Sequence, residues 1–264
     1  MTAINILPLH DAVYLFSDGA NYDRDGVLQA VTSKTYIMSG ISTAMMCSGR
    51  AIIVPYLAHH LTRGVKDFDE LRATITDRLP GFDDHLTKLF GEDDYSPTDG
   101  KQGFRLFFAG WSPQHNRPGA FVISNSTKDE ENPPYSVIDA DRGKMAPGVT
   151  LEECALGYGG PPRITPETIE NVALTTLELQ RHQLEEDGSS RVGGHVEFVT
   201  VQRDRIETRI LKRWSEDQVG EIMRPAPIDW DQWRRDHPVN DPCAGMSRLQ
   251  REMYLKKQKK RRAA

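Results

Sequence analysis

The sequence predicts an α+β fold in which helical layers cover two packed sheets. Short β-rich runs follow one another in groups, and the helical segments fall into two sets, one after residue 49 and one after residue 165. Strictly alternating strands and helices would instead indicate a parallel sheet, and that pattern does not occur.

The first third of the chain predicts three strands, over residues 12–17, 35–38 and 42–47. Each is a β-rich run that ends at or near an Asp-Gly or Ser-Gly turn signal. We expect these three strands to be neighbours in one sheet.

A helical pattern begins after Ser48-Gly49. It predicts a helix over residues 50–62, in which Pro55 either kinks the helix or marks its first turn. A second helix is expected over 67–79, ending at Pro80-Gly81, and a third over 83–90.

The middle of the chain returns to strands. Residues 104–110 and 120–123 flank a turn and predict a hairpin, with a third strand over 135–139.

Thr165-Pro166 predicts a helix start, because Thr is a good N-cap and Pro suits the first helical position. The expected buried face follows the helical period: Ile169, Val172, Ala173, Thr176, Leu177 and Gln180. A closing hairpin is predicted from 196–201 and 205–211.

Composition places the chain among ordinary globular proteins. Of its 264 residues 38% are hydrophobic and 27% are charged, and no apolar run reaches the roughly 18 residues of a membrane span. The first residues lack a basic, then apolar, secretory pattern, so we expect a cytoplasmic protein that does not enter a membrane.

Nothing in the sequence predicts a cofactor or a metal site. Three scattered cysteines contain no C-x-x-C pair, which argues against a zinc site or a disulfide framework. A calcium-loop-like start at residues 21–26 has Thr32 where the bidentate Glu is required. His59 and His60 are adjacent and so lie on different helix faces, and the glycines at 157–160 are followed by two prolines, which cannot open a dinucleotide-binding helix.

A boundary is predicted near the two prolines at 225 and 227, which divides the chain into a body, residues 1–223, and a C-terminal arm, residues 224–264. Residues 248–264 carry eight Lys or Arg and one acid, about +7, so with a net charge of −5 the rest is near −12. The tail is either a solvated terminus or an arm that binds an acidic partner surface or a phosphate backbone.

One group of residues points to chemistry. Thr2 follows an initiator Met of the kind that is commonly removed, Asp18 ends the first predicted strand, and Lys34 precedes the next. A free threonine α-amine is a base next to the hydroxyl that it would activate, a lysine lowers the pKa of both groups, and an aspartate orients the lysine. Ser48 and Gly49 lie at a strand-to-helix junction, where backbone N–H groups can form an oxyanion hole.

These residues resemble a known family. The segment 13–20 (VYLFSDGA), then Gly26, Lys34 and Cys47-Ser48-Gly49, is similar to the N-terminal half of proteasome β-type subunits and their bacterial ATP-dependent protease relatives. The glycines at 157–159 and the Gly-Gly step before His195 occur there in the same order. The resemblance covers residues 2–223 and implies a four-layer αββα fold of N-terminal nucleophile (Ntn) hydrolases, with Thr2, Asp18 and Lys34 as nucleophile, aspartate and lysine. Proteins of this size and turn type also resemble proteasome-like proteins of tailed phages and prophages.

Two departures from the family bear on activity. Tyr158 stands where active eukaryotic-type subunits have a serine, and Ser189 and Val192 stand where they have an aspartate and a serine. Two functions therefore remain open: an N-terminal threonine peptidase or amidase that acts through an acyl-enzyme, or an inert member of the same fold used as an assembly subunit, for example in a phage particle. Either reading predicts a homo-oligomer or a subunit of a larger assembly, with no nucleic acid partner except through the basic tail and no cofactor.

Overall fold

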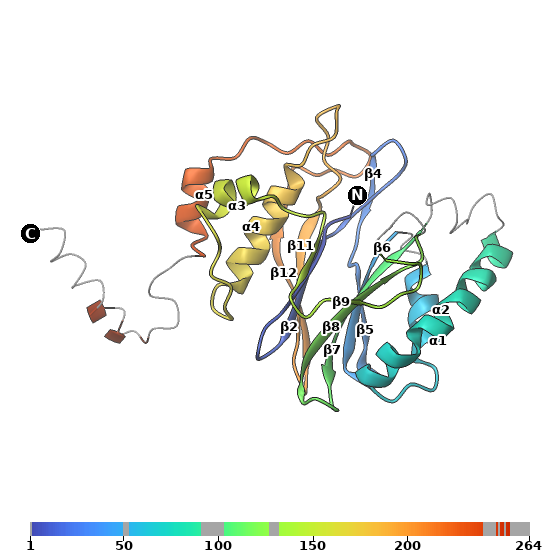
Figure 1. The fold of residues 1–264 in the computed structure, drawn as a ribbon. Coiled ribbons are helices and arrows are strands. Elements are labelled where there is room, and N and C mark those ends of the chain that lie inside the picture. Colours follow the sequence, from blue (N-terminus) through green and yellow to red (C-terminus); the bar gives the residue numbers. More distant parts are fainter. Residues whose placement is uncertain are drawn as a thin grey trace, which may run out of the picture.

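The computed structural model describes residues 2–49, 53–90, 103–126, 132–239, 247, 249–250 and 252–253. Within these ranges the chain forms three antiparallel sheets and five α-helices, which confirms the α+β class (Figure 1).

The first sheet has five strands in the order β10-β1-β2-β11-β12. Their bounds are Lys144–Ala146, Ile4–Pro8, Val13–Asp18, His195–Val201 and Ile206–Arg213. Ile4 pairs with Ser17 and Val196 pairs with Asp18. The beginning of β1, the end of β2 and the beginning of β11 therefore meet at the same end of this sheet.

The second sheet has the order β5-β6-β7-β8-β9. Its strands are Thr35–Met38, Thr43–Ser48, Arg105–Ser112, Arg117–Ser124 and Ile138–Asp139, and a short 3₁₀ helix, Ser39–Ile41, joins the first two. The β7–β8 and β11–β12 hairpins confirm two predictions, although β9 is shorter than expected.

The prediction that residues 12–17, 35–38 and 42–47 share one sheet is wrong. β2 belongs to the first sheet, whereas β5 and β6 belong to the second. A two-stranded ribbon, β3 (Ala20–Tyr22) with β4 (Leu28–Val31), lies between them in the chain and leads it from one sheet to the other. Every residue of β2 is buried, because this strand is covered on both faces, and a β-rich run of that kind does not reveal which strands pair with it.

Three apolar clusters separate four layers (Figure 1). The middle cluster joins the facing sides of the two sheets and includes Leu15 and Phe107. A second lies between the second sheet and helices α1 (Val54–Thr62) and α2 (Phe68–Phe90). The third lies between the first sheet and helices α3 (Leu151–Tyr158) and α4 (Ile169–Arg181). The two sets of helices thus cover opposite outer faces of the two packed sheets.

Helix α2 corrects the prediction of two separate helices over 67–79 and 83–90. The structure has one helix, with Pro80 inside it. The buried side chains Ile75, Leu79, Phe82 and Leu86 keep a spacing of three or four residues across the proline, so one apolar face continues. Burial of that face offsets the backbone hydrogen bond that Pro80 cannot make.

The other helix boundaries differ by a few residues. Pro55 occupies the first turn of α1, and residues 50–52 of the predicted helix lie outside the described residues. Helix α4 begins at Ile169, three residues after the predicted first helical residue Pro166. The Thr168 hydroxyl accepts a hydrogen bond from the Thr165 N–H, and residues 166–168 form a turn. Helix α3 was not predicted, although Thr150 and Glu153 form a capping box at its start.

The described part of the C-terminal arm packs on the first sheet's helices. Helix α5 (Trp230–Asp236) contacts α3, and the Trp233 indole N–H donates to the Thr175 hydroxyl at 2.9 Å. Val239 joins the same apolar cluster. Most of the basic segment 248–264 lies outside the described residues, and the division at residue 223 stays a prediction.

A glycine pair tests the packing of α2 on its sheet. A Cβ at Gly110 would lie 2.1 Å from the Phe68 ring, whereas a Cβ at Gly81 meets nothing within 4 Å. We expect Gly110→Ala to lower the free energy of unfolding by about 1–3 kcal/mol because of overpacking. The matched control Gly81→Ala, inside α2, should raise it by about 0.5–1 kcal/mol. Urea denaturation of both variants gives the comparison, and equal stabilities would contradict this packing.

Candidate active site

The three predicted residues Thr2, Asp18 and Lys34 lie together. The Lys34 ammonium donates to the Thr2 hydroxyl oxygen at 3.4 Å and to an Asp18 carboxylate oxygen at 2.8 Å. Thr2 precedes β1, Asp18 ends β2, and Lys34 precedes β5, so both large sheets contribute to the group. Their catalytic role stays a prediction.

Asp18 is fully buried, and each of its two carboxylate oxygens accepts two hydrogen bonds. One oxygen accepts the Ala3 N–H at 2.9 Å as well as the Lys34 ammonium. The other accepts the Ala20 N–H at 3.0 Å and the Gly193 N–H at 3.3 Å. A buried carboxylate requires such partners, and together they fix the position at which it holds the lysine.

Lys34 is almost fully buried, with 5% of its side chain exposed. Burial lowers the pKa of this ammonium, and the charges of Asp18 and Glu197 oppose that shift. A lysine with a lowered pKa gives up its proton more readily than an exposed one. Next to a hydroxyl, it is therefore suited to proton transfer.

Glu197 anchors the segment that carries Lys34, and the sequence analysis missed it. Its carboxylate accepts the Ser33 hydroxyl at 2.6 Å and the Lys34 backbone N–H at 3.1 Å. Because Glu197 lies on β11 and Lys34 precedes β5, this contact links the two sheets at the site. An alternating strand offers no signal that distinguishes such a residue from an ordinary surface acid.

Tyr22 is a second residue that the sequence did not reveal. Burial raises the pKa of its phenol, and a hydrogen bond with the Thr2 side chain opposes that rise. The Thr2 hydroxyl thus has a neighbour on β3 besides Lys34. Tyr22 lies in the β3–β4 ribbon, which was not predicted. The sequence therefore gave no indication that this tyrosine lies next to Thr2.

A buried arginine holds the Gly-Gly step next to Asp18. Arg181 donates to the Val192 carbonyl at 2.8 Å and to Asp217 at 2.7 Å, and Asp217 accepts the Gly194 N–H at 2.6 Å. These contacts fix the segment from which Gly193 donates to Asp18. A Cβ at Gly193 would lie 2.5 Å from the Asp217 carboxylate, which explains the need for glycine there.

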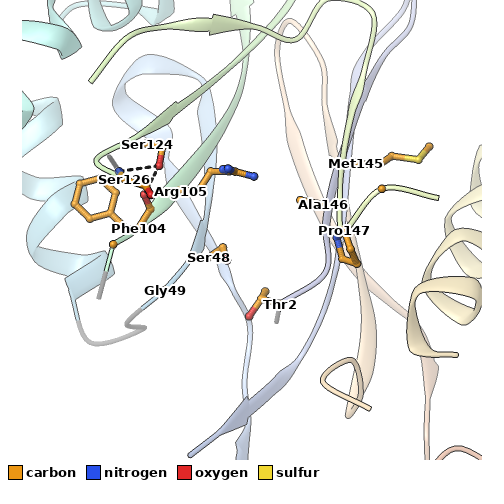
Figure 2. Close-up of a pocket in the computed structure, with 12 residues that line it drawn as sticks. Thr2, Ser48, Gly49, Phe104, Arg105, Ser124, Ser126, Met145, Ala146 and Pro147 are labelled. Carbon is orange, nitrogen blue, oxygen red and sulfur yellow. Dashed lines mark hydrogen bonds between the residues drawn. The ribbon is translucent and has the colours of Figure 1, made fainter. Parts of the chain in front are cut away.

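A cavity of about 340 Å³ opens beside Thr2 and contains the other two predicted residues, Ser48 and Gly49 (Figure 2). Gly49 has a φ of +129°, and a Cβ there would lie 2.9 Å from the Gly103 carbonyl oxygen. The oxyanion role of Ser48 and Gly49 stays a prediction. The lining residues are Thr2, Ser48, Gly49, Gly103, Phe104, Arg105, Ser124, Ser126, Met145, Ala146, Pro147 and Gly148.

Cys47, which lies near this group of residues, is not a candidate nucleophile. Its side chain is buried, and burial raises the pKa of the thiol to about 12. The thiolate is the reactive form of cysteine, so at neutral pH this residue is inert.

The positions at which the chain departs from the resembled family are also visible. The Tyr158 hydroxyl is bonded to Thr176 and to the Val172 carbonyl, both on α4. The Ser189 hydroxyl is buried and has no hydrogen-bond partner within the described part of the chain. Neither hydroxyl forms a hydrogen bond with Thr2, Asp18 or Lys34 in the described structure.

The comparisons with known proteins give no family assignment. No family model matches the sequence, and no curated protein matches it. Among the described residues, no three or more His, Cys, Asp or Glu side chains gather in a way that would hold a metal ion, and no helix is long and apolar enough to cross a membrane.

The buried ion pair can be tested by a double-mutant cycle. Asp18→Asn places an amide NH₂ among N–H donors and leaves Lys34 unpaired, so we expect it to cost about 3–5 kcal/mol in the free energy of unfolding. Lys34→Met should cost less, about 1–3 kcal/mol, because Asp18 keeps three backbone donors. The double variant should cost less than the sum, as measured by urea unfolding.

The control for this cycle is an exposed pair, Arg209 with Glu170 at 2.7 Å, whose side chains are 50% and 47% exposed. Arg209→Gln should change stability by no more than about 0.5 kcal/mol. Additive effects of Asp18→Asn and Lys34→Met would show that the two groups do not interact.

His195 predicts a pH dependence of stability. It is 4% exposed, neither ring nitrogen has a hydrogen-bond partner among the described residues, and burial lowers its pKa from the ordinary value of 6.5. The unfolded chain therefore binds more protons below about pH 6.5, so stability should fall as the pH drops from 6.5 toward the folded-state pKa. Urea midpoints at pH 7.5 and 5 should differ less in His195→Gln than in the wild type, and equal differences would contradict the assignment.

Proposed function

We propose that this protein is an N-terminal threonine hydrolase of the proteasome-like Ntn type, which cleaves peptide or other amide bonds through an acyl-enzyme on Thr2. One observation carries the proposal: the Thr2 hydroxyl is within hydrogen-bond distance of a lysine that is paired with a fully buried aspartate, beside a cavity that can admit a substrate. A hydroxyl, a nearby base and an orienting carboxylate are the parts that nucleophilic catalysis needs.

The proposed reaction begins with removal of Met1, which frees the Thr2 α-amine. The Thr2 hydroxyl oxygen attacks the carbonyl carbon, and its proton passes to the free α-amine, while the Lys34 ammonium donates to the Thr2 oxygen and lowers the pKa of both groups. Backbone N–H groups near Ser48 and Gly49 stabilise the negative oxygen of the tetrahedral intermediate. The amide nitrogen leaves with a proton, and water then hydrolyses the ester on Thr2 and restores the hydroxyl.

The layered arrangement of the chain supports the family part of the proposal. Two antiparallel sheets face each other and helices cover both outer faces, which is the αββα order that the resemblance implies. The site lies where the ends of β1 and β2 approach the segment before β5.

An inert assembly subunit of the same fold is the second candidate, and the contacts of Tyr158 favour it. This hydroxyl stands where the resembled active subunits have a serine, yet it is bonded within the α3–α4 layer. If the serine hydroxyl that Tyr158 replaces is essential for hydrolysis, the Thr2 site is catalytically inactive. The protein then acts as a structural subunit of an oligomer or of a larger particle.

The intact mass of the purified protein and its reaction with an N-terminal-threonine electrophile test the two candidates. The enzymatic proposal predicts loss of one methionine residue and a single β-lactone adduct on the Thr2 peptide. Thr2→Ala should lose both the adduct and hydrolysis, by at least about a thousandfold in rate, because alanine lacks the oxygen that attacks the carbonyl carbon.

Thr2→Ser is the matched control, since it keeps a hydroxyl and an α-amine and should retain measurable activity. Circular dichroism and urea unfolding establish that each variant is folded. A wild-type protein that keeps Met1 and takes up no adduct would favour the inert subunit, and hydrolysis that survives in Thr2→Ala would exclude Thr2 as the nucleophile.

A further inference from the structure

The cavity beside Thr2 is lined by an arginine whose charged side chain has no partner among the described residues. Arg105 is the first residue of β7 and is partly buried, yet its side chain makes no hydrogen bond or ion pair with any residue that the structure describes. Among the described lining residues it is the one with a charged side chain. By contrast, Arg72, Arg117 and Arg181 each pair with a carboxylate.

We propose that Arg105 binds a carboxylate of the substrate, so that the Thr2 site selects acidic peptides or acidic acyl groups. The inference rests on the proposed hydrolase function and specifies its substrate class. A guanidinium presents two parallel N–H donors that match a carboxylate, and the pair is stronger where water is partly excluded.

The register of the second sheet places Arg105 close to the reacting centre. Arg105 is directly opposite Ser48 in the β6–β7 pair, and Ser48 lines the same cavity as Thr2. Figure 2 shows the Arg105 side chain extending from β7 toward the Ala146–Pro147 segment, across the space above Thr2. A substrate whose carbonyl carbon lies at the Thr2 hydroxyl can therefore place a neighbouring side chain, or its chain end, next to Arg105.

None of the other described residues that line the cavity has a carboxylate that could pair with Arg105. Ser124 donates its hydroxyl to the Phe104 carbonyl at 3.1 Å and accepts the Ser126 N–H at 3.1 Å, so its oxygen is already engaged (Figure 2). Met145, Ala146 and Pro147 form a largely apolar wall. A ligand without a negative charge would leave the guanidinium unpaired against these walls, which disfavours neutral ligands.

The size of the cavity limits what it can hold. About 340 Å³ is near the lower end of the range for ligand sites in proteins, which suits one or two residues rather than a folded partner. The carboxylate can come from an Asp or Glu side chain or from the C-terminus of a short peptide. Both sources share the same chemistry, and the experiment separates them.

The test is binding of short peptides to the full-length protein, measured by isothermal titration calorimetry. The peptides are N-acetyl-Ala-Ala-Ala-Glu amide, the matching Gln amide, and the Gln peptide with a free C-terminal acid. The wild type should bind one of the two carboxylate peptides about tenfold to a hundredfold more tightly than the Gln amide. Arg105→Gln should lose that preference, and Arg105→Lys should keep part of it, because a lysine retains the charge without the fork.

The matched control is Arg205→Gln, which removes an arginine that is exposed in the β11–β12 turn and should keep the wild-type preference. Preference for the Glu amide identifies a side-chain carboxylate, and preference for the Gln acid identifies a chain end. The inference is overturned if the wild type binds none of the peptides at millimolar concentration, binds all three equally, or keeps its preference in Arg105→Gln.

Failure of this inference and failure of the proposed function give different results. Adduct formation at Thr2 by a β-lactone depends on the nucleophile, so a protein that forms the adduct without any carboxylate preference retains the proposed function and loses the assignment of Arg105. A protein that binds the Glu amide through Arg105 but forms no adduct retains the carboxylate site and loses the hydrolase.

Discussion

The buried pair of Lys34 and Asp18 is the interaction on which the rest of the site depends. An ammonium and a carboxylate this deeply buried are stable only when each finds partners, because their removal from water is costly. Asp18 has three backbone donors besides the lysine, from the chain before β1, from the chain after β2 and from the segment before β11. The requirement to satisfy one carboxylate thereby brings three strand ends to the same place.

This requirement also explains the network behind the site. Gly193 reaches Asp18 because Arg181 and Asp217 hold the segment around it, and Arg181 is itself fully buried on α4. Glu197 holds the segment that carries Lys34, because its carboxylate accepts the backbone N–H of Lys34 and the hydroxyl of Ser33. The helical layer and both sheets therefore contribute to the position of a single ammonium next to the Thr2 hydroxyl.

The two cationic side chains near Thr2, Lys34 and Arg105, have different environments and suit different tasks. Lys34 is paired and buried, and its lowered pKa suits proton transfer. The Arg105 side chain is partly exposed and has no partner among the described residues, which suits recognition of a ligand. If Thr2 is the nucleophile that we propose, one cation next to its hydroxyl and another across the cavity would separate catalysis from substrate selection.

The sequence by itself determined the fold class, the two hairpins and the residues Thr2, Asp18 and Lys34, because period, turn residues and the spacing of a resembled motif are local properties. It did not determine that β2 and β5 lie in different sheets, or that α2 continues through Pro80, because both depend on apolar faces that meet only when the layers pack. The roles of Glu197, Gly193, Tyr22 and Arg105 were likewise decided by the tertiary structure. The local sequence around each of these residues gives no sign of its role. Whether each one has a partner depends on which distant strand ends meet in the folded chain.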